Sequence, residues 1–386
     1  MKKSQRHFDR FAAKITSVSI AFAAIVFLSN GFCCGEFPEY LVLPDDVATP
    51  DGMAICPDTG DLVVACPNFG DTTKPACLIR IDSDGNVRKW VEVPVLEETG
   101  KAFPMGIAFG PDQSVWLCDN QNWPTGNGDD GELNQGRLLK LKIEGNRVVE
   151  TTVVADRISH PNGVKIRDGF AYMTVSCLPK IQEPDGFLRS AVYRFKLDDA
   201  NIHLANTAED PNLYAMIVTK NLDCQYGADG ICFDENGDLI IGNFGDGELV
   251  RVTTDRSKPV LTVYARSKPI PPLDSADGQA DASFLQKATQ VPMRTTDGIC
   301  RADDGTIYVA DFSNNAVARV APGGKSVDFL AISPDTDGLD GGLNQPGEPC
   351  LWNGRLAVTC FDMVTGPDKV NSKHDSQATI VFLPIE

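Results

Sequence analysis

Residues 297–311 read DGICRADDGTIYVAD, and this stretch decides how the rest of the chain is interpreted. An Asp-Gly pair leads into a short apolar run, a polar turn follows at Asp303-Asp304-Gly305, and a second β-rich run ends at Asp311. Two apolar runs separated by an Asp/Asn/Gly turn are typical of a β-hairpin. The stretch therefore predicts two antiparallel strands.

The same pattern occurs six times along the chain. Its glycines are Gly52, Gly106, Gly163, Gly230, Gly298 and Gly347. Their separations leave room for four short strands in each copy. Alternating apolar and polar residues predict a further strand in five copies, at 78–81, 137–141, 191–195, 248–252 and 316–320. Six four-stranded units arranged around an axis make an all-β, six-bladed β-propeller.

The two ends of the chain favour a closed ring. A linear solenoid is the alternative, but it would need a capping repeat at each end. Instead, the last copy is short and ends with a strand at 378–383, while residues 40–43 supply an unassigned strand at the start. We expect the N-terminal strand to complete the last blade, so that residues 36–386 form one propeller.

Residues 1–35 have the layout of a secretory signal peptide. A basic start with Lys2, Lys3 and Arg6 precedes an apolar run at 15–28, and small residues follow it. The run is too short for a comfortable membrane span, although an uncleaved signal anchor stays open as the alternative. We therefore expect an exported protein, periplasmic or extracellular, with no membrane span once the signal is removed.

The chain is acidic, with 53 Asp and Glu against 35 Lys and Arg and a formal net charge of −18. Such a surface repels phosphate backbones, which excludes nucleic acid as a partner and is compatible with cations or neutral small molecules. Cys66 and Cys77 flank a loop and could be bridged in an oxidising compartment. Four further cysteines are assigned to one repeat position as small core fillers: Cys56, Cys232, Cys300 and Cys350.

The residue before each repeat glycine is predicted to point towards the propeller axis. In order, these residues are Asp51, Met105, Asn162, Asp229, Asp297 and, in the sixth copy, either Pro346 or Glu348. Three converging carboxylates would repel one another, and a hard cation such as Ca²⁺, or else Zn²⁺ or Mg²⁺, would relieve that repulsion. The alternative is that Asp-Gly and Asn-Gly are simply turn dipeptides.

Two segments, 160–163 (HPNG) and 228–231 (ADGI), resemble the gluconolactonase/regucalcin family, also called the senescence marker protein family. The resemblance implies a six-bladed propeller that binds one divalent metal ion on its axis and opens lactone rings. It implies that Asn162 and Asp229 are metal ligands, with Asp51 in place of the family's Glu. The family's second-blade Asn falls near Met105 and is missing, and Asp297 is a candidate to compensate for it.

The fifth copy, including 277–284 and 297–320, is similar to NHL-type repeats, which also build six-bladed propellers and often serve in binding. Two functions follow. The first is a metal-dependent hydrolase of a lactone or related cyclic ester, with Asp229 and His160 as the acid/base residues. The alternative is a non-catalytic propeller that binds a carbohydrate or protein partner. A redox propeller has no support, since the sequence contains no c-type haem attachment motif.

Overall fold

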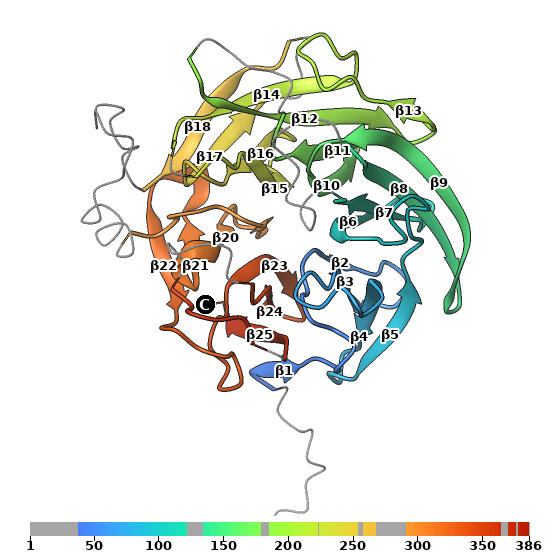
Figure 1. The fold of residues 1–386 in the computed structure, drawn as a ribbon. Helices are drawn as coiled ribbons and strands as arrows, with labels where there is room; N and C mark the ends of the chain where they lie inside the picture. Colours follow the sequence, from blue (N-terminus) through green and yellow to red (C-terminus); the bar gives the residue numbers. More distant parts are fainter. Residues whose placement is uncertain are drawn as a thin grey trace, which may run out of the picture. The chain divides into compact units, whose positions relative to one another are not determined.

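Six small antiparallel sheets stand side by side in a ring (Figure 1), as a computed structural model shows. The structure describes residues 38–121, 134–178, 185–222, 224–253, 258–267, 291–363, 370–375 and 377–385. The predicted signal peptide at 1–35 and the NHL-like residues 277–284 lie outside the described residues. The all-β six-bladed propeller predicted from the sequence is confirmed.

Each sheet is one blade, with its first strand nearest the axis and the later strands further out. Blade 1 contains β2 (Met53–Ile55), β3 (Leu62–Cys66), β4 (Cys77–Ile81) and β5 (Val87–Glu92). Blade 2 contains β6 (Pro104–Phe109), β7 (Val115–Asp119), β8 (Gly136–Glu144), β9 (Arg147–Ile158) and the short β13 (Ile202–His203). Blade 3 contains β10 (Pro161–Arg167), β11 (Phe170–Val175), β12 (Leu188–Lys196) and β14 (Leu213–Thr219).

The remaining three blades follow the same plan. Blade 4 contains β15 (Ala228–Phe233), β16 (Leu239–Asn243), β17 (Glu248–Val252) and β18 (Leu261–Arg266). Blade 5 contains β19 (Ile299–Arg301), β20 (Ile307–Asp311), β21 (Ala316–Val320) and β22 (Val327–Ile332), with 3₁₀ turns η2 (Phe312–Asn314) and η3 (Pro322–Gly324). Blade 6 contains β23 (Pro346–Trp352), β24 (Arg355–Cys360), β25 (Thr379–Pro384) and β1 (Tyr40–Val42).

The N-terminal strand closes the ring. β1 pairs antiparallel with β25, so that Tyr40 lies opposite Val381 and Val42 opposite Thr379. In Figure 1 the blue β1 and the red β25 accordingly lie side by side. This pairing confirms the predicted closure and removes the free sheet edge that an open solenoid would expose.

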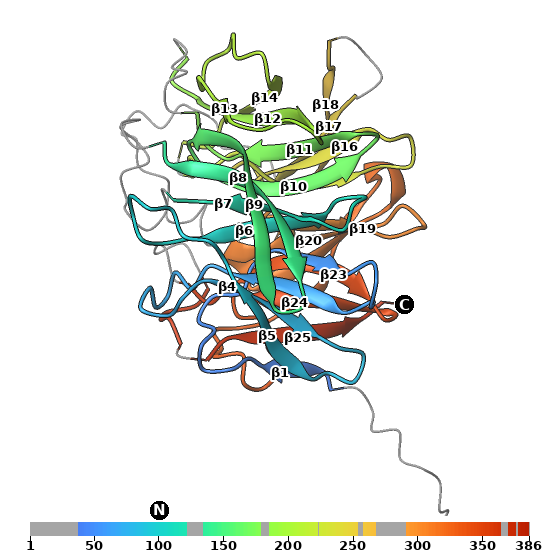
Figure 2. The ribbon, with the colours of Figure 1, turned by 90° about the vertical axis from the view of Figure 1, so that its right-hand side faces the viewer.

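Apolar side chains between neighbouring blades form the core. The second strand of a blade is buried on both faces; every residue of β3, β7, β16 and β20 is buried. One face of β16 contributes Ile241 to the cluster shared with blade 3, and the other contributes Ile240 to the cluster shared with blade 5. The stacked blades seen from the side in Figure 2 are held together by these layers.

The inner strands approach one another so closely that only glycine fits at the repeat position. A Cβ on Gly230 would lie 2.4 Å from the carbonyl oxygen of Asp297, and one on Gly52 would lie 2.4 Å from that of Met105. A Cβ on Gly106 would lie 2.5 Å from the oxygen of Asn162. These glycines therefore pack against the backbone of the next blade, and such contacts recur around the axis.

A β-bulge turns this part of the inner strand towards the axis. In blade 3 Pro161 pairs with Val175, and the next paired residue is Val164, opposite Met173. Blades 2, 4 and 6 show the same shift. Two residues on each of these inner strands thus lack a ladder partner, which leaves them free to face the channel.

The register corrects the assignment of the sixth repeat. Pro346 pairs with Cys360 and Pro349 with Val358, so Gly347 takes the position of the axial acids and Glu348 takes that of the repeat glycines. The sequence pattern assigned Gly347 to the glycine position of the repeat, which is one residue later than the position it occupies. The cause is that Glu-Pro replaces the apolar residues that usually follow the glycine. Glu348 still reaches the axis, whereas Pro346 is a paired strand residue.

The register also corrects the cysteine assignment. Cys232 lies opposite Ile240 and Cys300 opposite Tyr308, but the equivalent residue of blade 1 is Ala54, opposite Val63. Cys56 follows the end of β2 and is not part of this set. Cys66 and Cys77 lie directly opposite each other on β3 and β4, and both are free thiols.

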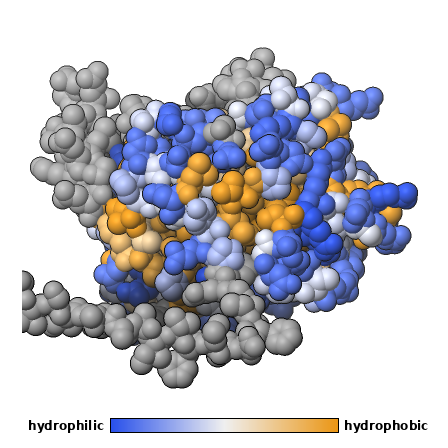
Figure 3. Space-filling view, turned by 90° about the horizontal axis from the view of Figure 1, so that it is seen from below, coloured by the Kyte–Doolittle hydropathy of each residue, from blue (hydrophilic) through white to orange (hydrophobic). Residues whose placement is uncertain are grey.

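The face of the molecule shown in Figure 3 is largely hydrophilic, with a band of apolar side chains across it. Within the described part of the chain, no helix has the length and apolar character needed to cross a bilayer.

The close packing of the repeat glycines predicts a large loss of stability when one of them gains a methyl group. We expect Gly230→Ala to lower the free energy of unfolding by about 3 kcal/mol, because the new Cβ would overlap backbone atoms that cannot move independently. Gly354→Ala is the control, since Gly354 lies in an open hairpin turn and only its positive φ of 74° is unfavourable, at about 1 kcal/mol. Denaturant unfolding measures both, and equal losses would contradict the close approach.

Candidate functional site

A small polar cavity lies on the propeller axis beside the repeat glycines. Its free volume is about 10 Å³, which suits one water molecule or one ion. Side chains from five blades line it: Asp51, Asn162, Lys165, Asp229, Asp297 and Glu348. The structure thus brings together all four predicted metal-binding residues and adds Lys165 and Glu348.

The carboxyl groups in this cavity hold their protons far more tightly than exposed ones. Burial, and after it the charge of Glu348, raises the pKa of Asp51 to about 8. Burial and the charges of Asp51 and Glu348 raise the pKa of Asp229 well above its usual range. Burial does the same for the pKa of Asp297, helped by the charges of Asp229, Asp51 and Glu348. The cavity therefore favours either protons or a cation over four bare carboxylates.

Asp229 and Asp297 act directly on each other within the cluster. A hydrogen bond between their side chains acts to lower the pKa of Asp229, against the larger effects of burial and of the charges of Asp51 and Glu348. Such a bond between two carboxyl groups requires a proton on one of them.

Among the described residues, Lys165 is the only basic side chain that lines the cavity. Its Nζ lies 3.7 Å from Oε1 of Glu348. Burial raises the pKa of Glu348 to about 7, while the Lys165 ammonium acts in the opposite direction. Burial lowers the pKa of Lys165, but the charges of Glu348, Cys350, Cys232 and Cys300 outweigh it and raise that pKa.

Residues at the end of the second strand of blade 3 position the two axial groups that the resemblance singled out. The Asn162 Nδ2 donates to Ser176 Oγ at 3.4 Å, which leaves its carbonyl oxygen available to the cavity. Thr174 Oγ1 donates to the backbone oxygen of Asp229 at 2.6 Å and accepts from the backbone N–H of Gly163 at 2.7 Å. Thr174 thereby fixes the inner strands of blades 3 and 4 relative to each other.

The donor chemistry fits a hard divalent cation. Asp51, Asp229 and Asp297 offer carboxylate oxygens and Asn162 offers an amide oxygen, around a space for a single ion. Among the described residues, however, no three His, Cys, Asp or Glu side chains stand in a preformed coordination shell.

A collar of aromatic rings, one or more from each blade, continues along the axis from the acidic residues. Its members are Phe103, Phe69, Phe361, Phe312, Phe244, Tyr226 and His160. Neighbouring ring centroids lie 5.1–6.1 Å apart, from the Phe69–Phe103 stack to the Phe244–Phe312 pair. All five phenylalanines are buried. The collar therefore fills the channel mouth at which the inner strands begin.

His160 belongs to this collar and not to the cavity lining. Its ring stands edge-on to Tyr226, and its Nδ1 is 2.9 Å from Ser159 Oγ. Burial lowers the pKa of His160 to about 4, so the imidazole is neutral at pH 7. Asp229, the other predicted acid/base residue, lines the cavity itself.

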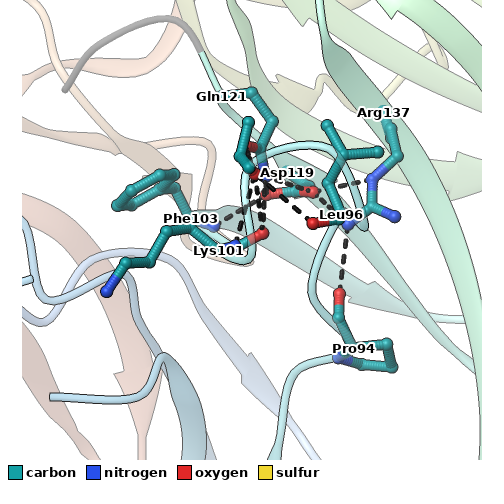
Figure 4. A network of polar contacts seen from close by, with 8 residues as sticks. Pro94, Leu96, Lys101, Phe103, Asp119, Gln121 and Arg137 are labelled. Carbon is teal, nitrogen blue, oxygen red and sulfur yellow. Dashed lines mark hydrogen bonds and ion pairs between the residues drawn. The ribbon is translucent and has the colours of Figure 1, made fainter. Parts of the chain in front are cut away.

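Within the described part of the chain, blade 2 contributes no polar side chain to the cavity lining. Met105, at the position of the missing family Asn, is 3% exposed and packs in the apolar core with Phe103. A buried network holds this segment in place (Figure 4). Asp119 accepts from the backbone N–H of Phe103 at 2.7 Å, from Gln121 Nε2 at 2.9 Å and from Arg137 Nε at 2.8 Å.

An aspartate also holds the chain before the inner strand of blade 5 through backbone hydrogen bonds. Asp311, which like Asp119 ends the second strand of its blade, accepts from the backbone N–H groups of Arg294 and Thr295 at 3.0 Å. The aspartates that end these strands therefore anchor the chain just before the inner strands, which is where the collar residues and axial acids are placed.

Two features of the site, Lys165 and the collar, escaped the sequence-based prediction although a signal existed for each, and a third, Glu348, was left undecided. Lys165 stands three residues after Asn162, where Cys232 and Cys300 stand relative to their own axial acids. Glu348 was left open beside Pro346. Phe244, Phe312 and Phe361 each directly follow a second strand, and this recurrence signals the collar.

Solved structures of several enzymes and binding proteins share this fold. A gluconolactonase from Xanthomonas campestris is 14% identical, with a TM-score of 0.50 and 89% of each chain covered. Regucalcin from Agrobacterium tumefaciens, described as a calcium-binding protein, is 13% identical, with a TM-score of 0.51 and 90% of this chain and 96% of that one covered.

A third neighbour performs different chemistry on the same scaffold. The PQQ-bound aldose sugar dehydrogenase from Streptomyces coelicolor is 16% identical, with a TM-score of 0.53 and 91% of this chain and 100% of that one covered. No protein-family model matches the sequence, and a search of curated proteins finds no match. At these identities the likeness confirms the gluconolactonase- and regucalcin-like propeller fold, and the fold by itself does not select one chemistry.

The raised pKa values predict how stability depends on pH in the absence of metal. Between the ordinary carboxyl pKa near 4 and the folded values of about 8 for Asp51 and 7 for Glu348, the folded protein binds more protons than the unfolded chain. Stability must therefore fall as pH rises through this window. In chelator-containing buffer we expect Tm to drop by roughly 5 °C or more from pH 5 to pH 8.

Asp297→Asn provides the control for this pH dependence. It removes the Asp297 carboxyl, whose own pKa is raised well above its usual range by burial and then by the neighbouring charges, so its Tm should change less between pH 5 and pH 8. A variant whose Tm falls as steeply as that of the wild type would show that the axial carboxyls are not the cause.

Proposed function

We propose that this protein is a metal-dependent hydrolase of a lactone or related cyclic ester, with one divalent ion held on the propeller axis. Ca²⁺ is the preferred ion, and Zn²⁺ or Mg²⁺ are the alternatives. The observation that carries the proposal is the convergence of three aspartates and one asparagine, from four blades, on a cavity sized for a single ion. A protein does not gather such charge on its axis without a group to balance it.

Each lining residue has a role in this proposal. Asp51, Asn162, Asp229 and Asp297 would hold the ion, which when bound polarises a carbonyl and lowers the pKa of a coordinated water. Asp229 is the proposed general base that takes the proton from the attacking water, because its carboxyl group lines the cavity in which that water would be held. His160 is a weaker candidate for this transfer, since it lies in the collar.

The fold neighbours support a small-molecule substrate. One of them is a gluconolactonase, and another is named as a calcium-binding protein. The acidic surface of this chain agrees with a neutral or cationic ligand and disfavours an anionic one. We infer a cyclic ester without phosphate groups as the substrate class.

The collar favours a second candidate, a non-catalytic propeller that binds a carbohydrate or protein partner. The axial cavity has room for one ion and none for a substrate, and buried phenylalanines occupy the adjoining mouth. A hydrolase must move collar rings aside to admit a substrate, whereas a binding protein with a structural ion need not. Turnover therefore separates the two functions.

The deciding experiment combines metal analysis with a lactone screen on Asp229→Ala. We expect the wild type to hold one divalent ion per chain and to hydrolyse at least one lactone, and we expect the variant to lose both, with kcat/KM reduced by about 10³-fold or more. Elemental analysis and a pH-indicator assay measure the two properties.

Asp304→Ala is the matched control, because Asp304 lies exposed in the hairpin turn of blade 5 and should leave ion content and rate unchanged. A wild type that holds the ion but opens no lactone would favour the binding propeller. A wild type that binds no divalent ion at all would rule out both the metal site and the hydrolase.

A further inference from the structure

Lys165 enters the axial cavity from β10, the inner strand of blade 3. It lies opposite Tyr172 in the register, as Cys232 lies opposite Ile240 and Cys300 opposite Tyr308 in the next blades. Lys165 thus belongs to the next layer of residues along the axis from Asn162, the layer of Cys232 and Cys300, and its side chain reaches the cavity that the aspartates line. In this layer the only described carboxylate in ion-pair contact with Lys165 is Glu348.

Glu348 is displaced towards that layer because blade 6 has an irregular repeat. It occupies the position held by glycine in the other blades, one residue further along the inner strand than the axial acids. Its Oε2 fills the space where a Cβ on Gly298 would lie, and its Oε1 is 3.7 Å from Lys165 Nζ. One oxygen of Glu348 is therefore paired with Lys165 and the other packs against Gly298 of blade 5.

We propose that Lys165 is a positioning residue that withholds Glu348 from the axial ion, so that the ion is held by Asp51, Asn162, Asp229 and Asp297 alone. This inference rests on the metal site of the proposed function. The Lys165–Glu348 pair is electrically neutral as a unit, and it leaves three carboxylates facing the cavity. One divalent ion then leaves a single negative charge, whereas a fourth free carboxylate would leave two.

The proposal predicts opposite effects for the two partners. Lys165→Met removes the positive charge, frees Glu348 and should tighten Ca²⁺ binding by roughly tenfold or more. Glu348→Gln leaves the ammonium unbalanced near the ion and should weaken Ca²⁺ binding by a similar factor. Met and Gln are close in size to the residues they replace, so packing around the channel is retained.

The double variant Lys165→Met/Glu348→Gln decides the question. Its cavity has the same net charge as that of the wild type, and it keeps every proposed ligand, so its Kd for Ca²⁺ should return to within about threefold of the wild-type value. Isothermal titration of each metal-free protein with Ca²⁺ gives the four Kd values. Thermal melts in chelator confirm that each variant is folded.

The outcomes separate this inference from the proposed function. A double variant as weak as Glu348→Gln would mean that Glu348 is itself a ligand, and Lys165→Met binding no more tightly than the wild type would mean that the ammonium does not restrain it; either result overturns the inference and leaves the metal site standing. A wild type that takes up no Ca²⁺ overturns the metal site, and the inference with it. Lys165→Arg, which keeps the charge, should bind like the wild type.

Discussion

The close approach of the six inner strands is the constraint on which the rest of this structure depends. The repeat glycines of blades 1 to 4 pack against a carbonyl of the next blade, at distances that a Cβ would reduce to 2.4–2.9 Å. Because the strands meet so tightly, the residues before four of the repeat glycines, Asp51, Asn162, Asp229 and Asp297, line the axial cavity, and in blades 3 and 4 a bulge frees that residue from the ladder. The close packing of the backbones thus brings together side chains that are far apart in sequence.

That convergence has an electrostatic consequence. Three aspartates and one glutamate line a buried cavity, where burial and the neighbouring charges raise the pKa values of Asp51 and Asp229 and where Glu348 pairs with Lys165. This electrostatic arrangement supports the proposed function, because a buried excess of carboxylate groups favours the binding of a cation.

The sequence predicts the fold well because its signals are local and repeated. Hairpin turns and alternating strands such as Glu248–Val252 and Ala316–Val320 are readable from a few residues, and six copies reinforce one another. The four axial oxygen donors followed from the same alignment. What failed was register: Gly347 was shifted by one residue, which the bulge of blade 6 reveals, and Cys56 was placed in the wrong set, which the pairing of Ala54 with Val63 corrects. The collar and the Lys165–Glu348 contact form between blades, and a sequence pattern within one blade does not give the distances between side chains of different blades.

The most direct test of the central claim is anomalous X-ray diffraction from crystals grown with Mn²⁺, a hard divalent ion that takes the same oxygen ligands as Ca²⁺. We expect one strong peak on the propeller axis, within ligand distance of Asp51, Asn162, Asp229 and Asp297, with Glu348 still turned towards Lys165. An axis without a peak would contradict the claim that this cluster exists to hold a cation.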